Sequence, residues 1–369
     1  GNDELVDVIV RYKDRPDQAE KVRTDRLGAL QKRAYKRLKM RSLRVPARQL
    51  EKLANSDRVE FISVDGVVES FTQAARRTAN QPTSGSNRYF DGTGVTVAVV
   101  DSGVTDHANL PSKYRIKQFN FLDGKTPSPI DEKSLSDPFG HGTHVAGIIA
   151  ADASGDAGET VFRDFVGLAD DADLVSLQVL DKKGQGVVSD VIAALDFILT
   201  YGDSLGIRVV NLSLGKAVES AAANDPLVQA ADALWDAGIT VVVSAGNYGR
   251  DGHFTITSPG NSPKVITVGS ITDNGTGRDF SDDFVSTYSS RGPTLHDHFL
   301  KPDLLAPGNR VTTAIPDKAQ LRIDLPDRVV RCGEDCDDAL ELSGTSMAAA
   351  MVSGAVALML DKDPNLTPD

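Results

Sequence analysis

The first 71 residues combine strand-like and helix-like hydrophobic patterns. Three segments alternate apolar and polar positions with the two-residue period of a strand: residues 5–12, 38–43 and 59–68. Two segments place apolar side chains at helical spacing: residues 17–35 and 47–55, the second with Pro46 at its first turn. An order of βαββαβ, or close to it, predicts a small α+β domain of the ferredoxin-like type.

A different pattern begins after residue 88. Five short runs are almost continuously apolar: residues 94–100, 174–180, 209–214, 240–243 and 265–268. Three helical patterns lie among or after them: residues 188–199, 226–237 and 346–360. Strands that are apolar on both faces and alternate with helices predict an α/β fold with a central, mostly parallel sheet. In such sheets the functional side chains gather at the carboxyl ends of the strands.

Charge and composition separate these two regions and exclude several classes of protein. Residues 1–71 contain 16 Lys and Arg and 12 Asp and Glu, whereas residues 72–369 contain 24 and 40. The first region thus has a net charge of +4 and the second a net charge of −16. Opposite net charges favour docking of a small domain on a large one, although such a difference between segments also arises by chance. Residues 72–87 are rich in Thr, Ser, Asn, Gln and Gly, and they predict an exposed linker. The net charge of −12 argues against nucleic-acid binding, and the longest apolar run, residues 355–360, is too short to span a membrane.

One predicted strand ends at a carboxylate, and one predicted helix begins at an imidazole. The first strand of the larger region runs into Asp101, where a carboxylate can be held ionised by backbone N–H groups or can simply form a turn. His141 lies between two glycines at a predicted helix start, where it is approachable. His144 follows within an apolar helix, so we interpret it as a packed core residue rather than as half of a metal site.

A hydroxyl and an amide occupy comparable positions further along the chain. Ser346 lies where a long helix of small residues begins, near N–H donors that suit a developing oxyanion. In isolation this stretch is more simply interpreted as a Ser or Thr helix cap. Asn247 follows a buried strand and Gly246, and it therefore presents an amide at a strand end.

Together these residues resemble the subtilisin-like serine proteases, or subtilases. The order Asp101, His141, Ser346 is the subtilisin order of an Asp-His-Ser triad. Each of the three lies within a motif typical of the family: residues 99–103, 141–147 and 344–348. Further motifs of the family follow at residues 211–215, 245–247, 289–293 and 301–308. The resemblance implies a subtilisin-like three-layer fold over residues 88–369, which would lack its last helical stretch.

The resemblance also implies a function: a secreted serine endopeptidase that acts on polypeptides through an acyl-enzyme and needs no cofactor for its chemistry. Ser346 would attack the scissile carbonyl, His141 would take its proton, and Asp101 would orient His141. The Asn247 amide and the Ser346 backbone N–H would form the oxyanion hole. Six residues would bind substrate, the first three by pairing with its backbone and the others as a pocket wall: Ser213, Leu214, Gly215, Ser244, Ala245 and Gly246.

Residues 1–71 resemble a subtilase propeptide, which acts as an intramolecular chaperone and inhibitor. Alignment of residues 64–71 with the end of such propeptides places self-cleavage between Phe71 and Thr72, with Phe71 and Val68 in two apolar pockets. Cleavage after the dibasic pair Arg76-Arg77 is the alternative. The resemblance therefore implies a self-processing zymogen whose signal peptide has been removed and whose propeptide is its own inhibitory partner.

Some positions depart from the family pattern or stay open. Ala350 and Met351 replace the usual Pro and His after the serine motif, and since Ala favours helices, the helix should persist. The loop at residues 152–165 has acids compatible with a structural calcium ion and equally with a solvated loop: Asp152, Asp156, Glu159 and Asp164. In a secreted protein Cys332 and Cys336 are expected to form a disulfide, with two free thiols or a metal as alternatives.

Two other functional classes compete with the protease interpretation. A catalytically silent subtilase relative acting as a binding module would show no turnover, but the intact triad and Asn247 argue against it. An esterase of the α/β-hydrolase type needs a Gly-x-Ser-x-Gly elbow and the chain order Ser, Asp, His, whereas the order here is Asp, His, Ser. The physiological substrate is not encoded in any motif; by analogy Thr257 lies near the base of the specificity pocket and favours an apolar side chain of moderate size.

Overall fold

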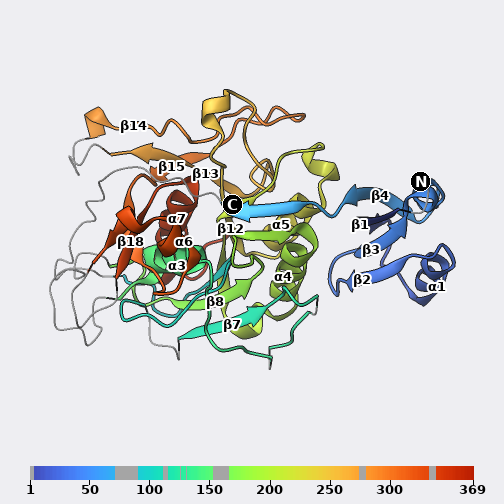
Figure 1. The fold of residues 1–369 in the computed structure, drawn as a ribbon, viewed down its shortest axis with the longest axis horizontal. Coiled ribbons are helices and arrows are strands. Elements are labelled where there is room, and N and C mark those ends of the chain that lie inside the picture. The colour runs from blue at the N-terminus through green and yellow to red at the C-terminus, as the bar shows by residue number, and fades with distance from the viewer. Residues whose placement is uncertain are drawn as a thin grey trace.

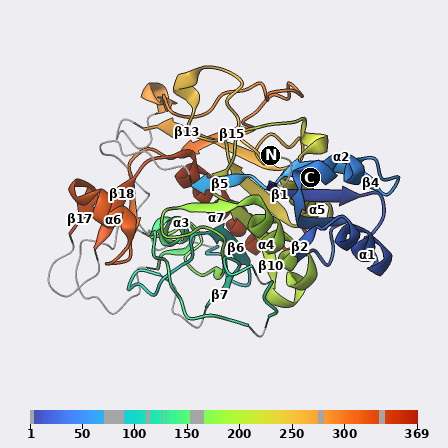
Figure 2. The same cartoon turned by 45° about the vertical axis from the view of Figure 1, so that its right-hand side comes forward.

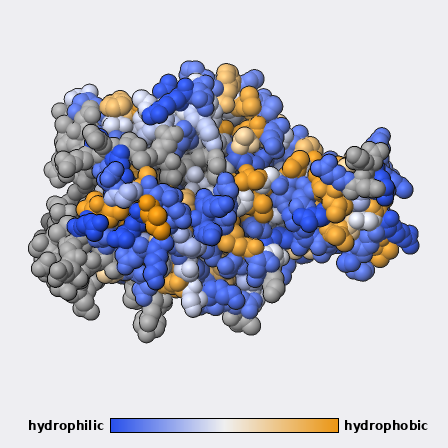
Figure 3. Space-filling view, viewed as in Figure 1, coloured by the Kyte–Doolittle hydropathy of each residue, from blue (hydrophilic) through white to orange (hydrophobic). Residues whose placement is uncertain are grey.

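The chain folds into a small N-terminal domain and a larger body, at the right and left of Figure 1. This computed structural model describes residues 4–70, 90–110, 115–124, 126–129, 131–152, 166–273, 280–331 and 338–369. The face shown in Figure 3 is mostly hydrophilic, with hydrophobic residues in small groups. None of the described helices is both long and apolar enough to cross a membrane.

The N-terminal domain is a four-stranded antiparallel sheet with two short helices. Its elements are β1 (Leu5–Tyr12), α1 (Gln18–Arg26), β2 (Leu30–Ala34), β3 (Met40–Pro46), α2 (Leu50–Ala54) and β4 (Val59–Val64). The strands lie in the order β2-β3-β1-β4. Apolar side chains from all parts of the domain, among them Val8, Leu43 and Leu53, form its own core.

The helix predicted over residues 17–35 is wrong beyond Arg26. Asp17 caps α1 by accepting a hydrogen bond of 2.9 Å from the backbone N–H of Glu20. The helix ends before Gly28, whose φ of +74° suits glycine. Residues Leu30–Ala34 then pair with β3 as strand β2. Leu30 is 62% exposed, so the side chain that suggested a buried helical face is not buried at all.

The strand predicted over residues 59–68 is divided into two strands that belong to different sheets. β4 pairs with β1 in the N-terminal domain. β5 (Val67–Ser70) lies instead between β11 (Leu214–Gly215) and β9 (Gln185–Val187) of the body, antiparallel to both. Figures 1 and 2 show β5 leaving the N-terminal domain and lying on the body.

The body is built on a mostly parallel sheet, as predicted. Strands lie in the order β14-β13-β12-β10-β6-β8-β7, with β15 also paired to β13. The antiparallel member of this sheet is β14, which pairs with β13. The strands are β6 (Thr96–Asp101), β7 (Ile116–Asn120), β8 (Asp173–Gln178), β10 (Ile207–Leu212), β12 (Thr240–Ser244), β13 (Ile266–Thr272), β14 (Phe284–Val285) and β15 (Leu304–Pro307).

Helices cover both faces of this sheet, which confirms the three-layer α/β fold. The helices are α3 (His141–Ala150), α4 (Val188–Tyr201), α5 (Pro226–Asp236), α6 (Gln320–Asp324) and α7 (Thr345–Lys362). Alternate residues of β6 belong to two separate cores: Ala98 and Val100 pack with α4 and α5, whereas Val97 and Val99 pack with α3 and α7. Because both faces are buried, the strand sequence is apolar throughout. Helix α7 continues through Ala350 and Met351, in agreement with the expected helix.

A second, antiparallel sheet precedes helix α7. It contains β16 (Val311–Ala314), β18 (Ala339–Leu342) and β17 (Val329–Val330), in that order. Since β18 ends three residues before α7 begins, this sheet fixes where the first turn of α7 lies. His144 of α3 also bonds to it, with Nε2 3.0 Å from the carbonyl oxygen of Leu340.

Candidate active site

Asp101 and His141 form a buried pair where strand β6 meets helix α3. Both carboxylate oxygens of Asp101 lie 2.8 Å from Nδ1 of His141. Both side chains are inaccessible to solvent. Since a ring nitrogen facing a carboxylate carries the proton, Nδ1 is the donor and Nε2 is left as the basic nitrogen. Among the described residues, His141 Nε2 has no hydrogen-bond partner.

Gly142 allows α3 to approach β6 closely enough for this pair. A Cβ atom at position 142 would lie 2.1 Å from the carbonyl oxygen of Gly103 and 3.2 Å from Cβ of Asp101. The first distance, to a backbone oxygen, is shorter than any van der Waals contact, so a larger residue would push the helix away from the strand. The glycine after His141 is therefore a geometric requirement of the Asp101–His141 contact.

Ser346 lies in the first turn of α7, which packs against α3. Its hydroxyl donates to the carbonyl oxygen of Ser213 at 3.1 Å, and the hydroxyl of Ser213 donates back to the carbonyl oxygen of Ser346 at 2.9 Å. Asn211 donates to Ser213 and accepts from Ser353, so the end of β10 is tied to α7 by a buried chain of hydrogen bonds. The structure contains no hydrogen bond between Ser346 and Nε2 of His141, the contact that completes a triad.

Asn247 is oriented by its contacts with Thr345. Its amide oxygen accepts hydrogen bonds of 3.0 Å from both the backbone N–H and the hydroxyl of Thr345, the residue before Ser346. The hydroxyl of Thr345 also accepts from the backbone N–H of Gly246 at 3.2 Å. Because the oxygen is engaged on this side, the amide is held with its nitrogen end as the donor beside the start of α7.

The predicted substrate-pairing strand is paired with the chain's own strand β5. In this register Leu214 is opposite Ser70 and Gly215 is opposite Glu69, while β9 covers the other edge of β5. Val68 is fully buried in the core that contains Leu212 and Leu214. The carbonyl oxygen of Gly184 accepts from the backbone N–H of Ser70 at 3.2 Å. The segment just before the predicted cleavage point therefore lies as an extended strand between β11 and β9, and we call the place between these two strands the cleft.

Ser244, Ala245 and Gly246 follow directly at the carboxyl end of β12. All three are buried, and the backbone N–H of Thr257 donates to the carbonyl oxygen of Ala245 at 3.1 Å. Gly246 has a φ of +100°, and a Cβ atom there would lie 2.8 Å from the Thr257 side chain. The Thr257 side chain thus lies against Gly246, and its place near the base of a specificity pocket stays a prediction.

Asp137 is a residue of this site that the sequence analysis missed. Its buried carboxylate accepts hydrogen bonds from the backbone N–H groups of Gly140 and Thr143 at 2.7 and 2.8 Å, and from the hydroxyls of Ser102 and Thr143, both at 2.8 Å. Burial raises the pKa of Asp137 and these hydrogen bonds oppose the rise. Its sequence signal is weak, because an Asp before Pro138 looks like an ordinary turn residue.

Several expected residues lie outside the described parts of the chain. They are Phe71 and Thr72 of the predicted junction, Cys332 and Cys336 of the predicted disulfide, and Asp156, Glu159 and Asp164 of the acidic loop. Within the described ranges, no group of three or more His, Cys, Asp or Glu side chains is arranged to hold a metal ion.

Comparison with known proteins supplies a family for this arrangement. The model of the subtilase family matches residues 92–369. The chain is 39% identical over 284 residues to serine protease AprX of Bacillus subtilis (strain 168), a match that covers 75% of this chain and 59% of AprX. It is 32% identical over 337 residues to the extracellular serine proteinase of Thermus sp. (strain Rt41A), which covers 89% of this chain and 67% of that protein. The chain thus spans about three fifths to two thirds of the length of these relatives.

One solved structure resembles the whole chain in fold. The crystal structure of fervidolysin from Fervidobacterium pennivorans, a keratinolytic enzyme related to subtilisin, aligns with all of this chain and 56% of its own at a TM-score of 0.73 and 21% identity. The alignment extends over the N-terminal domain as well as the body.

Proposed function

The chain belongs to the subtilase family, and from this premise we propose that it is a serine endopeptidase made as a self-processing zymogen. Ser346 is the nucleophile, His141 the general base and acid, and Asp101 the group that orients His141 and stabilises its charged form. The observation that carries this proposal is the solvent-inaccessible Asp101–His141 pair, with both carboxylate oxygens 2.8 Å from Nδ1. In the neutral imidazole, a proton held on Nδ1 by the carboxylate makes Nε2 the basic nitrogen, as a general base requires.

Proton transfer requires the Ser346 hydroxyl to turn from the Ser213 carbonyl oxygen, where it now donates, toward Nε2 of His141. Hydrogen bonds between catalytic groups are often loose before substrate binds and tighten in the reacting complex. The proton then passes from His141 to the leaving amine, and water repeats the sequence on the acyl-enzyme. The nucleophile, the base and the oxyanion donors all come from the chain, so the chemistry needs no cofactor.

The oxyanion hole consists of the Asn247 amide and the Ser346 backbone N–H. The position of Asn247 supports this role, since its amide oxygen is held by Thr345 and its nitrogen end is the remaining donor. Donors fixed before the reaction stabilise the negative charge that develops on the carbonyl oxygen. Loss of one such donor typically lowers turnover by about 100- to 1000-fold.

Substrate binds as an extended strand between β11 and β9, the place that β5 occupies here. Pairing with Leu214 and Gly215 reads the backbone, while the wall of Ser244, Ala245 and Gly246 bounds the pocket for the residue before the cleaved bond. Because β5 fills the cleft, residues 1–71 act as an inhibitory propeptide that remains bound after cleavage between Phe71 and Thr72. The relative named an extracellular proteinase supports a secreted location.

The test compares the full-length chain with Ser346→Ala and, as a control, Ser204→Ala, an exposed serine that follows helix α4. We expect purified wild type and Ser204→Ala to cut themselves into two fragments and to hydrolyse peptides once the N-terminal fragment is removed. Ser346→Ala should stay one uncut chain. Cleavage of purified Ser346→Ala without added protease would disprove the assignment of the nucleophile. A wild type that stays uncut and shows no peptidase turnover would favour the alternative, a catalytically silent binding module.

A further inference from the structure

Helix α4 presents three polar groups to the N-terminal domain: the backbone N–H of Ser189 and the carboxylates of Asp190 and Asp196. We call these three groups the α4 docking face. Apolar side chains surround it, because Tyr35, Leu38 and Met40 of the N-terminal domain share one core with α4. Apolar contact of this kind supplies affinity but discriminates weakly between partners of similar shape. The polar groups are therefore the candidates for selecting the partner.

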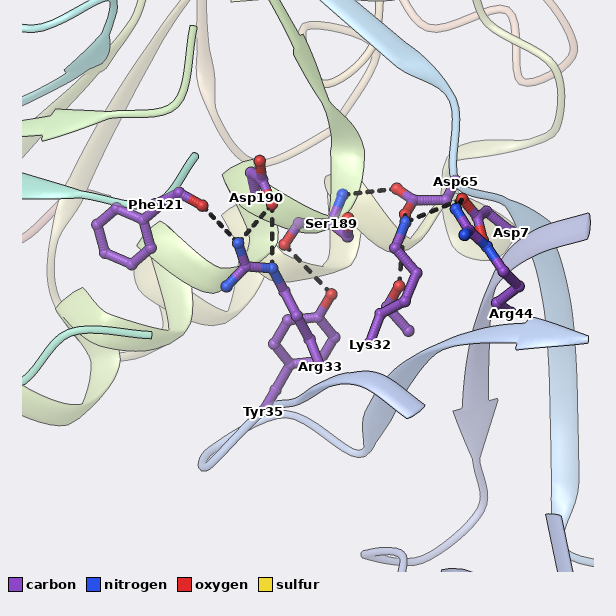
Figure 4. Close-up of polar contacts among 10 residues, drawn as sticks. Asp7, Lys32, Arg33, Tyr35, Arg44, Asp65, Phe121, Ser189 and Asp190 are labelled. Atoms are coloured by element: carbon purple, nitrogen blue, oxygen red, sulfur yellow. Dashed lines mark hydrogen bonds and ion pairs between the residues drawn. The ribbon is translucent and has the colours of Figure 1, made fainter. Parts of the chain in front are cut away.

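Asp190 forms a buried ion pair with Arg33 of strand β2. The guanidinium lies 3.0 Å (Nε) and 2.5 Å (Nη2) from one carboxylate oxygen of Asp190, and it also donates to the carbonyl oxygen of Phe121 in the body. Figure 4 shows Arg33 reaching out of the N-terminal domain to both residues. The side chain of Arg33 is 3% exposed and that of Asp190 is 12% exposed. Burial raises the pKa of Asp190 and Arg33 opposes the rise, so desolvation is the largest influence on this carboxyl group.

Asp196, on the same helix, binds a turn of the N-terminal domain. Its carboxylate accepts hydrogen bonds from three consecutive backbone N–H groups, those of Lys36 at 2.6 Å, Arg37 at 2.6 Å and Leu38 at 3.1 Å. This contact depends on the backbone shape of the turn between β2 and β3 rather than on its side chains. Separation of the domain would return all three N–H groups to water.

Asp65 links the docking face to the strand in the cleft. One oxygen accepts from the backbone N–H of Ser189 at 2.8 Å, and the other lies 2.8 Å from Lys32, which also contacts Asp7 at 3.1 Å. Figure 4 shows this row of contacts beside the Arg33–Asp190 pair. Because Asp65 stands two residues before β5, the α4 docking face also sets where β5 enters the cleft.

We propose that Asp190 and Asp196 are the specificity determinants of docking: they select an N-terminal domain with a buried arginine at position 33 and the turn at positions 36–38, whereas the surrounding apolar contacts supply most of the affinity. The reason is the energetics of buried charge. A buried ion pair gains little over a well-packed apolar pair, because desolvation offsets the attraction, but removal of one partner leaves a buried charge unpaired. The body should therefore bind a domain that lacks these groups much more weakly, whereas its affinity for the matching domain is lowered only modestly.

The experiment measures hydrogen exchange in the full chain carrying Ser346→Ala, so it does not depend on catalysis. The amides of residues 36–38 and of Ser189 are bonded across the interface, and their exchange reports separation of the domain. We expect Arg33→Met and Asp190→Leu each to accelerate this exchange about 100-fold or more. The double variant should lie within about 10-fold of the parent, because an apolar pair replaces the ion pair.

Arg37→Met is the matched control, because it removes the same charge from an exposed side chain on the same turn. Amides of β1 and β3 report whether the N-terminal domain itself stays folded. If Arg33→Met unfolds the N-terminal domain, the result for Asp190→Leu tests the proposal instead, since that substitution lies in the body. Exchange in Arg33→Met equal to that in Arg37→Met would overturn the proposal. So would a double variant as fast as the single ones, since the pair would then supply affinity rather than selection.

Discussion

His144 is a fully buried histidine one turn beyond His141 on α3. Its Nε2 atom donates to the carbonyl oxygens of Leu340 at 3.0 Å and Val311 at 3.2 Å. Its Nδ1 atom has no hydrogen-bond partner among the described residues. Burial, with a further contribution from His141, lowers the pKa of His144 from 6.5 to about 3. The residue is therefore neutral in the folded protein and acts in packing, as the sequence analysis interprets it.

This pKa predicts that His144 makes the fold sensitive to acid. Between pH 6.5 and about 3 the unfolded chain binds one more proton at this position than the folded chain. The unfolding free energy should therefore fall as pH falls, by about 1.4 kcal/mol per unit from this residue. We expect His144→Gln, in the Ser346→Ala background, to flatten the curve of unfolding free energy against pH between 6 and 4, measured by urea unfolding. Parallel curves for the two proteins would contradict the prediction.

Helix α3 is an element whose first turn is organised by residues outside it. Its N-cap is Gly140, which has no side chain to satisfy the first backbone N–H groups. Asp137 takes over this role by accepting from Gly140 and Thr143. Ser102 connects the same carboxylate to the end of β6, since its hydroxyl donates to Asp137 and accepts from the backbone N–H of Gly142 at 2.9 Å. The helix start that carries His141 is thereby fixed relative to Asp101.

We predict that Asp137 is a positioning residue for His141. Asp137→Ala removes the acceptor for several buried donors and should let the first turn of α3 shift, with a loss in kcat of about 100-fold and little change in KM. Asp137→Asn retains one acceptor oxygen and should recover part of the loss. Steady-state kinetics on processed enzyme, with circular dichroism to verify folding, measure both. An equal loss of activity in the two variants would argue against positioning by this acceptor.

At the scale of the whole molecule, we expect the docked N-terminal domain to decide which peptide bond reaches Ser346. Its sheet is anchored on α4, and β5 continues from that anchor into the cleft, where Ser70 pairs with Leu214. A strand held at both ends in this way has one register, since a shift by one residue would move Val68 out of its buried position.

This register predicts the cleavage point. We expect the large fragment of the wild-type chain to begin at Thr72, because the pairing of β5 with β11 extends to Ser70, two residues before Thr72. N-terminal sequencing of that fragment is the measurement. A start at Thr78, after Arg76-Arg77, would show that processing does not follow the strand in the cleft.

The local sequence was enough to predict a helix or strand wherever that element is buried on both faces or carries its own capping residues. The five predicted body strands, observed as β6, β8, β10, β12 and β13, lie close to where the apolar runs place them, because burial on both faces leaves a continuous apolar pattern. The helices at Val188–Tyr201, Pro226–Asp236 and Thr345–Lys362 also lie close to their predicted positions. Strands β7, β14 and β15 were not predicted, since exposed positions interrupt their apolar pattern. The candidate side chains Asp101, His141 and Ser346 were recognisable because their order and the motifs around them resemble those of the subtilases.

Contacts between segments distant in sequence determined the elements and site residues that the local sequence did not predict. Leu30–Ala34 is a strand because β3 offers it a partner, and β5 leaves the strand predicted over residues 59–68 because the cleft offers it two. Asp137, Asp190 and Asp196 look like ordinary acidic residues in sequence, since their partners are set by the packing of one element on another. Periodicity records which face of an element is buried, but it does not record which element covers that face.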